Sequence, residues 1–210
     1  MKDPYYSRSE VSNSDLSALK KLLYGGPDFD PTEAYKFGTL IDCMLTEPEK
    51  VDFFNYTCAG EQYTPAQFEQ ARQMKRAFFK DDLASRMLAR ADTQAIMFRD
   101  MQIEFEGFKF SLPVRCKWDI WMKIVKWGGD IKSTTATSQK QFEAAARHFD
   151  YDRQRAFYMD IAGSNQDILI AVSKVNFQVF KIPIKRGDEL FTSGQNKYKE
   201  LAFQYWNLIA

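Results

Sequence analysis

The hydrophobic pattern of this chain of 210 residues changes its period about halfway along, and this change constrains the fold more than any other feature. Before residue 100, apolar residues recur at helical spacing, as at Phe68, Ala71, Met74 and Phe78. From residue 102 onward, strand-like alternation and short apolar runs appear between helical stretches. The order of helices, strands, helix, strands and helix predicts an α+β or α/β fold with an N-terminal helical region.

The first hundred residues are predicted to be mainly helical. Ser12-Asn13-Ser14-Asp15 offers N-caps for a helix over residues 16–23, which Gly25-Gly26-Pro27 ends. Further helices are expected over residues 32–46, closed by Glu47-Pro48-Glu49, from Thr64-Pro65 onward, and over residues 82–91.

The second half is predicted to hold the strands. Strands over 102–105 and 108–110 flank a turn at Glu106-Gly107, and a longer strand over 114–124 turns at Trp127-Gly128-Gly129 into residues 130–132. This part of the chain is expected to form an antiparallel meander. The remaining elements are a helical stretch from Ser138 to Gly163 that breaks near Asp150, strands over 168–174 and 176–184, and a helix over 188–207. We expect one domain over residues 1–210, with a helical part over 1–100 and a core over 101–210.

The residues most suggestive of chemistry lie on two of these strands. Asp130 and Lys132 alternate along one strand and therefore share a face, while Ile131 points into the core. A hairpin turning near residue 127 would bring Asp119, on the preceding strand, beside Asp130. The sequence thus predicts two carboxylates and an ammonium group close together.

Phosphodiester hydrolysis uses such a set of groups. Magnesium prefers carboxylate oxygens and keeps some of its waters, and it lowers the pKa of a bound water. Lys132 beside that water would stabilise the transition state, and the carbonyl of Ile131 would add an oxygen ligand. Taken alone, however, Asp-x-Lys on a strand is more often a solvated face with a weak ion pair.

Two further pairs have the spacing of one helix face. Gln154 and Tyr158 are four residues apart, as are Gly38 and Asp42. A half-buried amphipathic stripe explains the first pair equally well, and helix packing at a small residue explains the second better when it is taken in isolation.

Together, these residues resemble a known family. Asp119, then Asp130-Ile131-Lys132, then Gln154-x-x-x-Tyr158 resembles the RecB-like branch of the PD-(D/E)xK nucleases, especially the RecE (exonuclease VIII) nucleases of phages and prophages. The resemblance covers nearly the whole chain and includes residues 12–16, 38–49, 130–134 and 151–158. It implies a restriction-endonuclease-like core in which helices flank a central mixed sheet.

The resemblance also implies roles for individual residues. Asp119 and Asp130 would bind Mg²⁺, for which Mn²⁺ would substitute, and Lys132 would serve the attacking water. Gln154 and Tyr158 would order the site or the DNA backbone beside it. Where the family has histidine in a G-T-x-x-H motif, this chain has Asp42, which is itself a competent magnesium ligand.

The function that the resemblance implies is a DNA exonuclease acting on the ends of linear duplex DNA. It further suggests 5′-to-3′ polarity, a single-strand annealing protein as partner, and a homo-oligomeric ring. A restriction-like endonuclease of the same fold is an alternative. A catalytically inactive DNA-binding module is another, favoured slightly by Asp42 and by the net charge of +1. Related iron–sulfur nucleases need four cysteines, and this chain has three.

Several other residues are candidates for binding roles. Basic residues interleaved with phenylalanine are expected to line a DNA path, although a solvated helix face fits them as well; they are Arg72, Lys75, Arg76, Phe78, Phe79 and Lys80. Glu104 is a weaker site candidate, because Glu106 has an equal claim.

The three cysteines and the single histidine, His148, are not expected to form a site. The cysteines have no C-x-x-C spacing, which predicts buried free thiols, and His148 is expected at the surface.

No apolar run approaches the roughly 20 residues that span a bilayer, and the N-terminus lacks the apolar stretch of a signal peptide. These features predict a cytoplasmic protein without a membrane segment.

Overall fold

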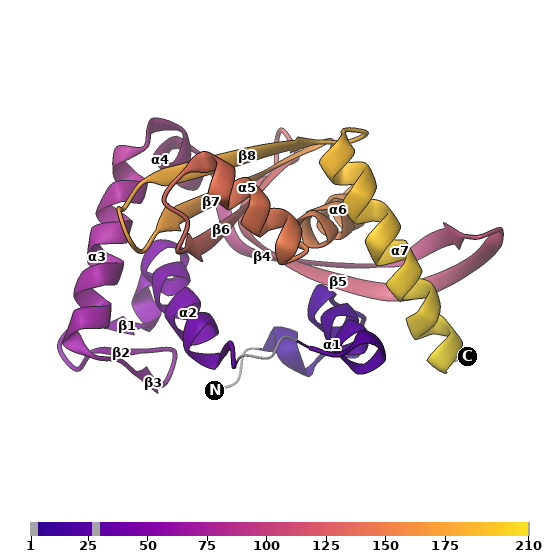
Figure 1. Cartoon of the computed structure of the whole chain (residues 1–210), viewed down its shortest axis with the longest axis horizontal. Coiled ribbons are helices and arrows are strands. Elements are labelled where there is room, and N and C mark those ends of the chain that lie inside the picture. The colour runs from indigo at the N-terminus through magenta and orange to yellow at the C-terminus, as the bar shows by residue number, and fades with distance from the viewer. Residues whose placement is uncertain (1–3, 27–29, 210) are drawn as a thin grey trace.

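A computed structural model describes residues 4–26 and 30–209, and its centre is a five-stranded sheet. The strand order is β4-β5-β6-β7-β8 (Figure 1). Strands β6 and β7 are parallel and the other neighbours are antiparallel. The strands are β4 (Asp92–Phe105), β5 (Phe108–Met122), β6 (Trp127–Thr134), β7 (Gln166–Ser173) and β8 (Val179–Lys185). The predicted mixed sheet flanked by helices is confirmed.

Helices cover both faces of the sheet, and each face has its own apolar cluster (Figure 1). One layer contains α2 (Thr32–Thr46), α3 (Pro65–Lys80) and α4 (Asp82–Leu88). The other contains α1 (Asn13–Tyr24), α5 (Gln139–His148), α6 (Tyr151–Ala162) and α7 (Glu189–Ile209). Short elements precede α1 and follow α2: η1 (Pro4–Ser7), η2 (Pro48–Lys50), β1 (Val51–Asp52), β2 (Thr57–Cys58) and β3 (Glu61–Gln62).

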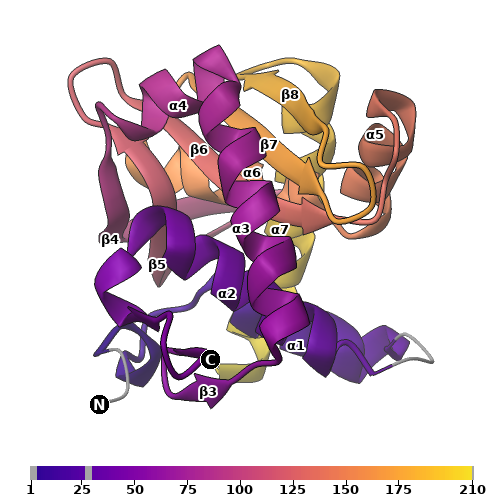
Figure 2. The same ribbon diagram turned by 90° about the vertical axis from the view of Figure 1, so that its left-hand side faces the viewer.

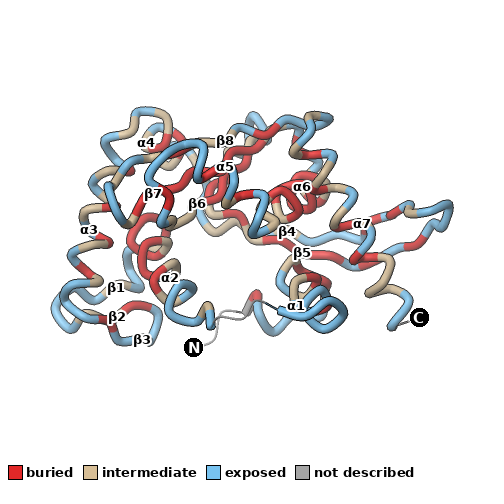
Figure 3. Tube along the Cα trace, in the orientation of Figure 1, coloured by how far each residue is buried: buried red, intermediate tan, exposed pale blue. Residues whose placement is uncertain are grey.

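Residue alternation assigns the strand side chains to these two layers. On β6, Ile131 packs in the cluster beneath α2 and α3, so its neighbours Asp130 and Lys132 face the side of α6. Strand β7 is buried at every position after Gln166, because helices cover both of its faces (Figure 3). The central strands therefore hold charged side chains inside a mostly apolar interior.

The predicted helix starts are confirmed. The Ser12 side chain accepts a hydrogen bond from the backbone N–H of Asp15, whose carboxylate in turn accepts one from the N–H of Ser12. Thr64 and Gln67 make the same capping box ahead of α3. Asp150 takes a left-handed conformation, with a φ of 52°, and separates α5 from α6 where the break was expected.

The predicted extent of the N-terminal helical part and the predicted position of the β5–β6 turn were wrong. Strand β4 begins at Asp92 and β1–β3 lie within residues 51–62, so the first hundred residues are less helical than expected. The hairpin between β5 and β6 turns over residues 123–126, and Gly128 lies inside β6. Gly128 serves close packing, since a Cβ there would lie 1.8 Å from the ring of Trp118. Pro27 of the expected Gly-Gly-Pro stop lies outside the described residues.

The cysteines and the histidine lie where the sequence predicts. Cys43, Cys58 and Cys116 are free and buried. His148 is exposed at the end of α5. Among the helices of the described ranges, none combines the length and apolar character needed to cross a bilayer.

Replacing Gly194 with alanine should destabilise the protein by about 1–3 kcal/mol, the usual range for overpacking a close contact. A Cβ on Gly194 of α7 would lie 2.1 Å from the backbone carbonyl oxygen of Asp152 on α6, and backbone cannot move aside as a side chain can. Chemical denaturation would measure the loss. Gly38→Ala is the matched control: apart from its chain neighbours and the backbone of its own helix, no described atom lies within 4 Å of the added Cβ, so the helix should gain up to about 1 kcal/mol. Equal stability of the two variants would contradict this account.

Candidate metal and phosphodiester site

The candidate site lies where strands β5 and β6 separate. Their pairing covers only residues 120–122 of β5 against 127–129 of β6. One step beyond it, the carboxylate of Asp119 accepts a hydrogen bond from the backbone N–H of Ile131 at 2.8 Å. A side chain thereby takes the place of the missing strand partner and brings Asp119 to the start of the Asp130-Ile131-Lys132 segment.

Asp130 and Lys132 form a close ion pair on the face of β6 opposite Ile131. Lys132 Nζ lies 2.6 Å from Asp130 Oδ2 and 5.0 Å from the centre of the Tyr151 ring at the start of α6. Asp130 is 3% exposed, whereas the Lys132 side chain is 21% exposed. The ammonium group therefore lies between a buried carboxylate and the surface.

Helix α2 adds a third carboxylate, Asp42, to the electrostatics of this cluster. Burial and then the charge of Asp130 raise the pKa of Asp119 to about 6, although Lys132 opposes the shift. Burial and then the charge of Asp119 raise the pKa of Asp42 well above its usual range. Burial together with mutual repulsion thus favours protons on these carboxylates, and a cation would relieve the repulsion.

The pKa of Lys132 is raised as well, and for an ammonium group this shift favours the charged form. Burial alone would lower the pKa of its ammonium group, but the charges of Asp130 and Asp119 outweigh burial and raise it. Lys132 therefore keeps its proton at neutral pH. It can donate hydrogen bonds and positive charge, but it cannot accept a proton as a base.

The donor set suits a hard cation. The carboxylates of Asp42, Asp119 and Asp130 and the carbonyl of Ile131 are all oxygen donors of the kind Mg²⁺ prefers. Asp130 Oδ2 is buried, and its polar contact among the described residues is the ion pair with Lys132. In the described part of the chain, no three acidic, histidine or cysteine side chains already stand close enough to enclose a metal ion.

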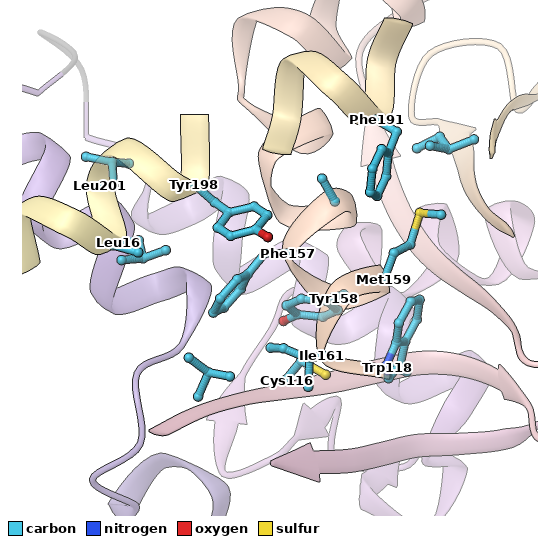
Figure 4. Packing of buried hydrophobic residues seen from close by; sticks show 14 of the residues in the cluster. Leu16, Cys116, Trp118, Phe157, Tyr158, Met159, Ile161, Phe191, Tyr198 and Leu201 are labelled. Atoms are coloured by element: carbon cyan, nitrogen blue, oxygen red, sulfur yellow. The ribbon is translucent and has the colours of Figure 1, made fainter. Parts of the chain in front are cut away.

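Gln154 and Tyr158 lie on α6 but make no direct contact with the three carboxylates among the interactions seen. Tyr158 is 7% exposed and packs edge-on against Trp118, with ring centres 5.5 Å apart (Figure 4). Burial raises the pKa of Tyr158 well above its usual value. Gln154 is half-buried, and its side chain shows no hydrogen bond to a described residue. The geometry therefore places Tyr158 in the supporting core of the site.

The residue of α6 that reaches the site is Arg155, which sequence reasoning missed. It is fully buried, and its Nη1 donates to Asp130 Oδ1 at 2.7 Å while its Nε donates to Asp167 Oδ2 at 2.6 Å. Its guanidinium group lies 4.5 Å from the Trp118 ring centre and 4.7 Å from that of Tyr158. Arg155 thus occupies one oxygen of Asp130 and leaves the other for Lys132 or a ligand.

Glu104 lies away from the carboxylates, and the basic candidates lie on a different element from any of them. Glu104 is exposed near the tip of the β4–β5 hairpin and pairs with Lys109, about 30 Å along β5 from Asp119 by strand rise. The weaker expectation that Glu104 faces the site is therefore wrong, because the hairpin is much longer than predicted. The basic residues 72, 75, 76 and 80 lie on α3, in the opposite layer from α6.

Comparisons with known proteins agree with this architecture. A family model described as a PDDEXK-like domain of unknown function (DUF3799) matches residues 10–210. The structure of a candidate exonuclease from Eubacterium rectale has 19% sequence identity to this chain and a TM-score of 0.56. The match covers 91% of this chain and 71% of the exonuclease chain. A phage-related exonuclease from Haemophilus somnus 129PT is 14% identical, with a TM-score of 0.42 over 94% of this chain and 83% of its own. No curated protein sequence matches this chain. At 19% identity, the likeness to the Eubacterium rectale structure concerns the fold alone.

Proposed function

The chain belongs to the PDDEXK-like DUF3799 family, and from that premise we propose that it is a metal-dependent DNA exonuclease of the RecE kind. Its reaction would be hydrolysis of phosphodiester bonds at the ends of linear duplex DNA, with 5′-to-3′ polarity. The observation that carries the proposal is the assembly of Asp119, Asp130 and Lys132 where β5 and β6 separate. The exonuclease name of the similarly folded protein from Eubacterium rectale also supports it.

The chemistry follows from these groups. Asp42, Asp119, Asp130 and the Ile131 carbonyl would hold Mg²⁺ or Mn²⁺, which when bound supplies a water of lowered pKa and neutralises charge on the phosphate. Lys132 remains protonated, so it would orient the attacking oxygen and stabilise charge that develops on the phosphoryl group. The hydrogen bond from Ile131 N–H fixes one Asp119 oxygen and leaves the other for a ligand.

Asp42 stands where related nucleases have histidine, and its chemistry is compatible with this role. Carboxylate is a harder ligand than imidazole and suits Mg²⁺ well. The additional negative charge raises the electrostatic repulsion among the carboxylates, which makes cation binding more favourable at a pH where they are ionised.

The proposal is tested with linear duplex DNA, with and without a 5′-phosphate, beside a closed circle of the same sequence. Each substrate is incubated with the purified chain and Mg²⁺, Mn²⁺ or a chelator. Degradation of only the linear DNA, dependent on metal, is expected, and end-labelling then reports polarity. Cutting of the circle would indicate a restriction-like endonuclease. Intact DNA in every reaction with folded protein would indicate an inactive DNA-binding module.

Assembly is part of the same proposal. A homo-oligomeric ring around DNA and a single-strand annealing protein as partner would suit an enzyme that stays on one DNA end and leaves a single-stranded tail. Light scattering with and without duplex ends measures the oligomer, and a monomer under both conditions would refute the ring.

Magnesium should raise the melting temperature more at about pH 7.5 than at about pH 5. The pKa of Asp119 is raised to about 6, above its unfolded value of about 4. Without metal, the stabilisation that comes from protonating Asp119 in the folded state is therefore fully present below about pH 4. It is lost as the pH rises through about 6. Metal binds the ionised form, so it must displace protons at the lower pH. Thermal melts with Mg²⁺ and with chelator measure the difference. An equal metal effect at both pH values would contradict the prediction, and Asp119→Asn should reduce it at both.

A further inference from the structure

The outward side of α3 carries a concentrated positive charge in a chain that is nearly neutral. Helix α3 has four cationic side chains and one acidic one, Glu69, whereas the whole chain has 29 basic and 28 acidic residues. Arg72, Arg76 and Lys80 are exposed and Lys75 is half-buried. Figure 2 shows α3 crossing in front of the sheet, so this side faces solvent.

Few acidic groups neutralise this charge. Arg72 lies 3.9 Å from Glu69, a long and exposed contact. The nearby Asp81 and Asp82 pair with Lys181 and Arg86. Lys75, Arg76 and Lys80 form no ion pair with any residue in the described ranges. Their charges are therefore free to attract an anion.

Aromatic rings lie between these charges in an open groove. A hollow of about 450 Å³ is lined by Phe53, Arg72, Lys75, Arg76, Phe79 and Lys80. A second hollow, of about 500 Å³, shares Arg76 and Lys80 and continues toward Phe177 and Val179. Phe53 is 38% exposed and Phe79 is 48% exposed. The two hollows share the side chains of Arg76 and Lys80, and we call them together the α3 groove.

The spacing of the charges fits a polynucleotide. Arg72, Arg76 and Lys80 lie one helical turn apart, so about 6 Å of axis separates each from the next. Alternate phosphates of one stacked DNA strand are about 7 Å apart along the axis. Exposed rings stack on bases only where those bases are unpaired, because in a duplex the base faces are already covered.

We infer that the α3 groove binds single-stranded DNA through Arg76, Lys80 and Phe79, separately from the carboxylate site. The inference deepens the proposed function, in which removal of one strand leaves a single-stranded tail. Cations along the groove hold phosphates, and the two rings provide stacking platforms for bases. Such contacts are independent of sequence, as an enzyme that degrades any linear duplex requires.

The test measures binding of a fluorescent oligothymidylate by the full chain in chelator, so that cleavage plays no part. Arg76→Ala/Lys80→Ala should reduce the slope of log K against log salt by about 1.4, at about 0.7 for each phosphate contact. Phe79→Ala should weaken binding about tenfold at constant salt. Lys123→Ala/Lys140→Ala removes the same charge from exposed positions on the β5–β6 turn and α5 and should leave the slope unchanged.

The outcomes separate this inference from the nuclease proposal. Unchanged slope and affinity in the α3 variants, or equal losses in the control, would overturn the groove whether or not the protein cleaves DNA. Displacement of the oligonucleotide by polyglutamate of matched charge, with no effect of Phe79→Ala, would show a general anion surface and also overturn it. Circular dichroism checks the fold, and Arg76→Gln/Lys80→Gln repeats the test with longer polar side chains.

Discussion

Replacing Lys132 with alanine is expected to lower the rate of cleavage of linear duplex DNA by at least about 10²–10³-fold, the effect of removing one preorganised charge donor from a transition state. The ammonium group lies 2.6 Å from Asp130 Oδ2, and its pKa is raised by Asp130 and Asp119 in spite of burial. Lys132 is therefore the positive side chain poised to stabilise charge on the phosphate. Single-turnover degradation of an end-labelled duplex measures the effect.

The Lys132→Ala result must be separated from loss of metal or of fold. Lys132 is a partly exposed side chain, and Asp130 keeps its second partner, Arg155, so the variant should remain folded. Removing a positive charge from the cluster should leave the metal-induced rise in melting temperature intact or increase it. Lys123→Ala, on the exposed turn before β6, is the matched control and should cleave at the normal rate. A Lys132→Ala rate within about threefold of normal, with metal bound, would remove Lys132 from the mechanism.

Local signals in the sequence were sufficient for most helices and for the pair at the centre of the site. Ser12 and Thr64 have cap partners three residues later, so the starts of α1 and α3 depend only on neighbours in the chain. Asp130 and Lys132 share a face through the two-residue repeat of a strand, and that geometry is also local.

The missed elements have weak local signals for physical reasons. Strand β4 is the edge of the sheet, and Ile96 and Phe98 on it are exposed, so its first half lacks a clean alternation of apolar and polar residues. Strands β1 to β3 have two residues each, which is too short for any period. The extent of the β5–β6 hairpin depended on Gly128, which packs against Trp118 rather than forming the turn.

The supporting residues of the site could not be inferred because their partners are distant in sequence. The four-residue spacing of Gln154 and Tyr158 defines a helix face but not what that face packs against. Arg155 lies between them and pairs with Asp130 and Asp167, which come from two parallel strands. The available signal was an aspartate, Asp167, directly before an apolar run over residues 168–172, since such a charge is buried only with a partner.

Replacing Arg155 with methionine should destabilise the protein by about 3–5 kcal/mol, because it leaves Asp130 and Asp167 buried without their shared partner. In a protein of this size that loss corresponds to a fall in melting temperature of on the order of 10 °C. Burial already raises the pKa of Asp167 to about 6, although Arg155 opposes the shift. Without Arg155 that pKa should rise further, so the variant's deficit should grow as the pH rises through about 6 and shrink toward about pH 5.

A second substitution distinguishes the lost ion pairs from lost packing, since Arg155 also stacks on Trp118 and Tyr158. Arg155→Met/Asp167→Asn removes one of the two stranded charges and should recover part of the stability at about pH 7.5 but little at about pH 5. If packing against the rings is the main contribution, the double variant will be as unstable as the single one at both pH values. A melting temperature of Arg155→Met within about 2 °C of normal across this pH range would show that the buried network contributes little to stability. Asp130 would then be held in place by β6 itself rather than by α6.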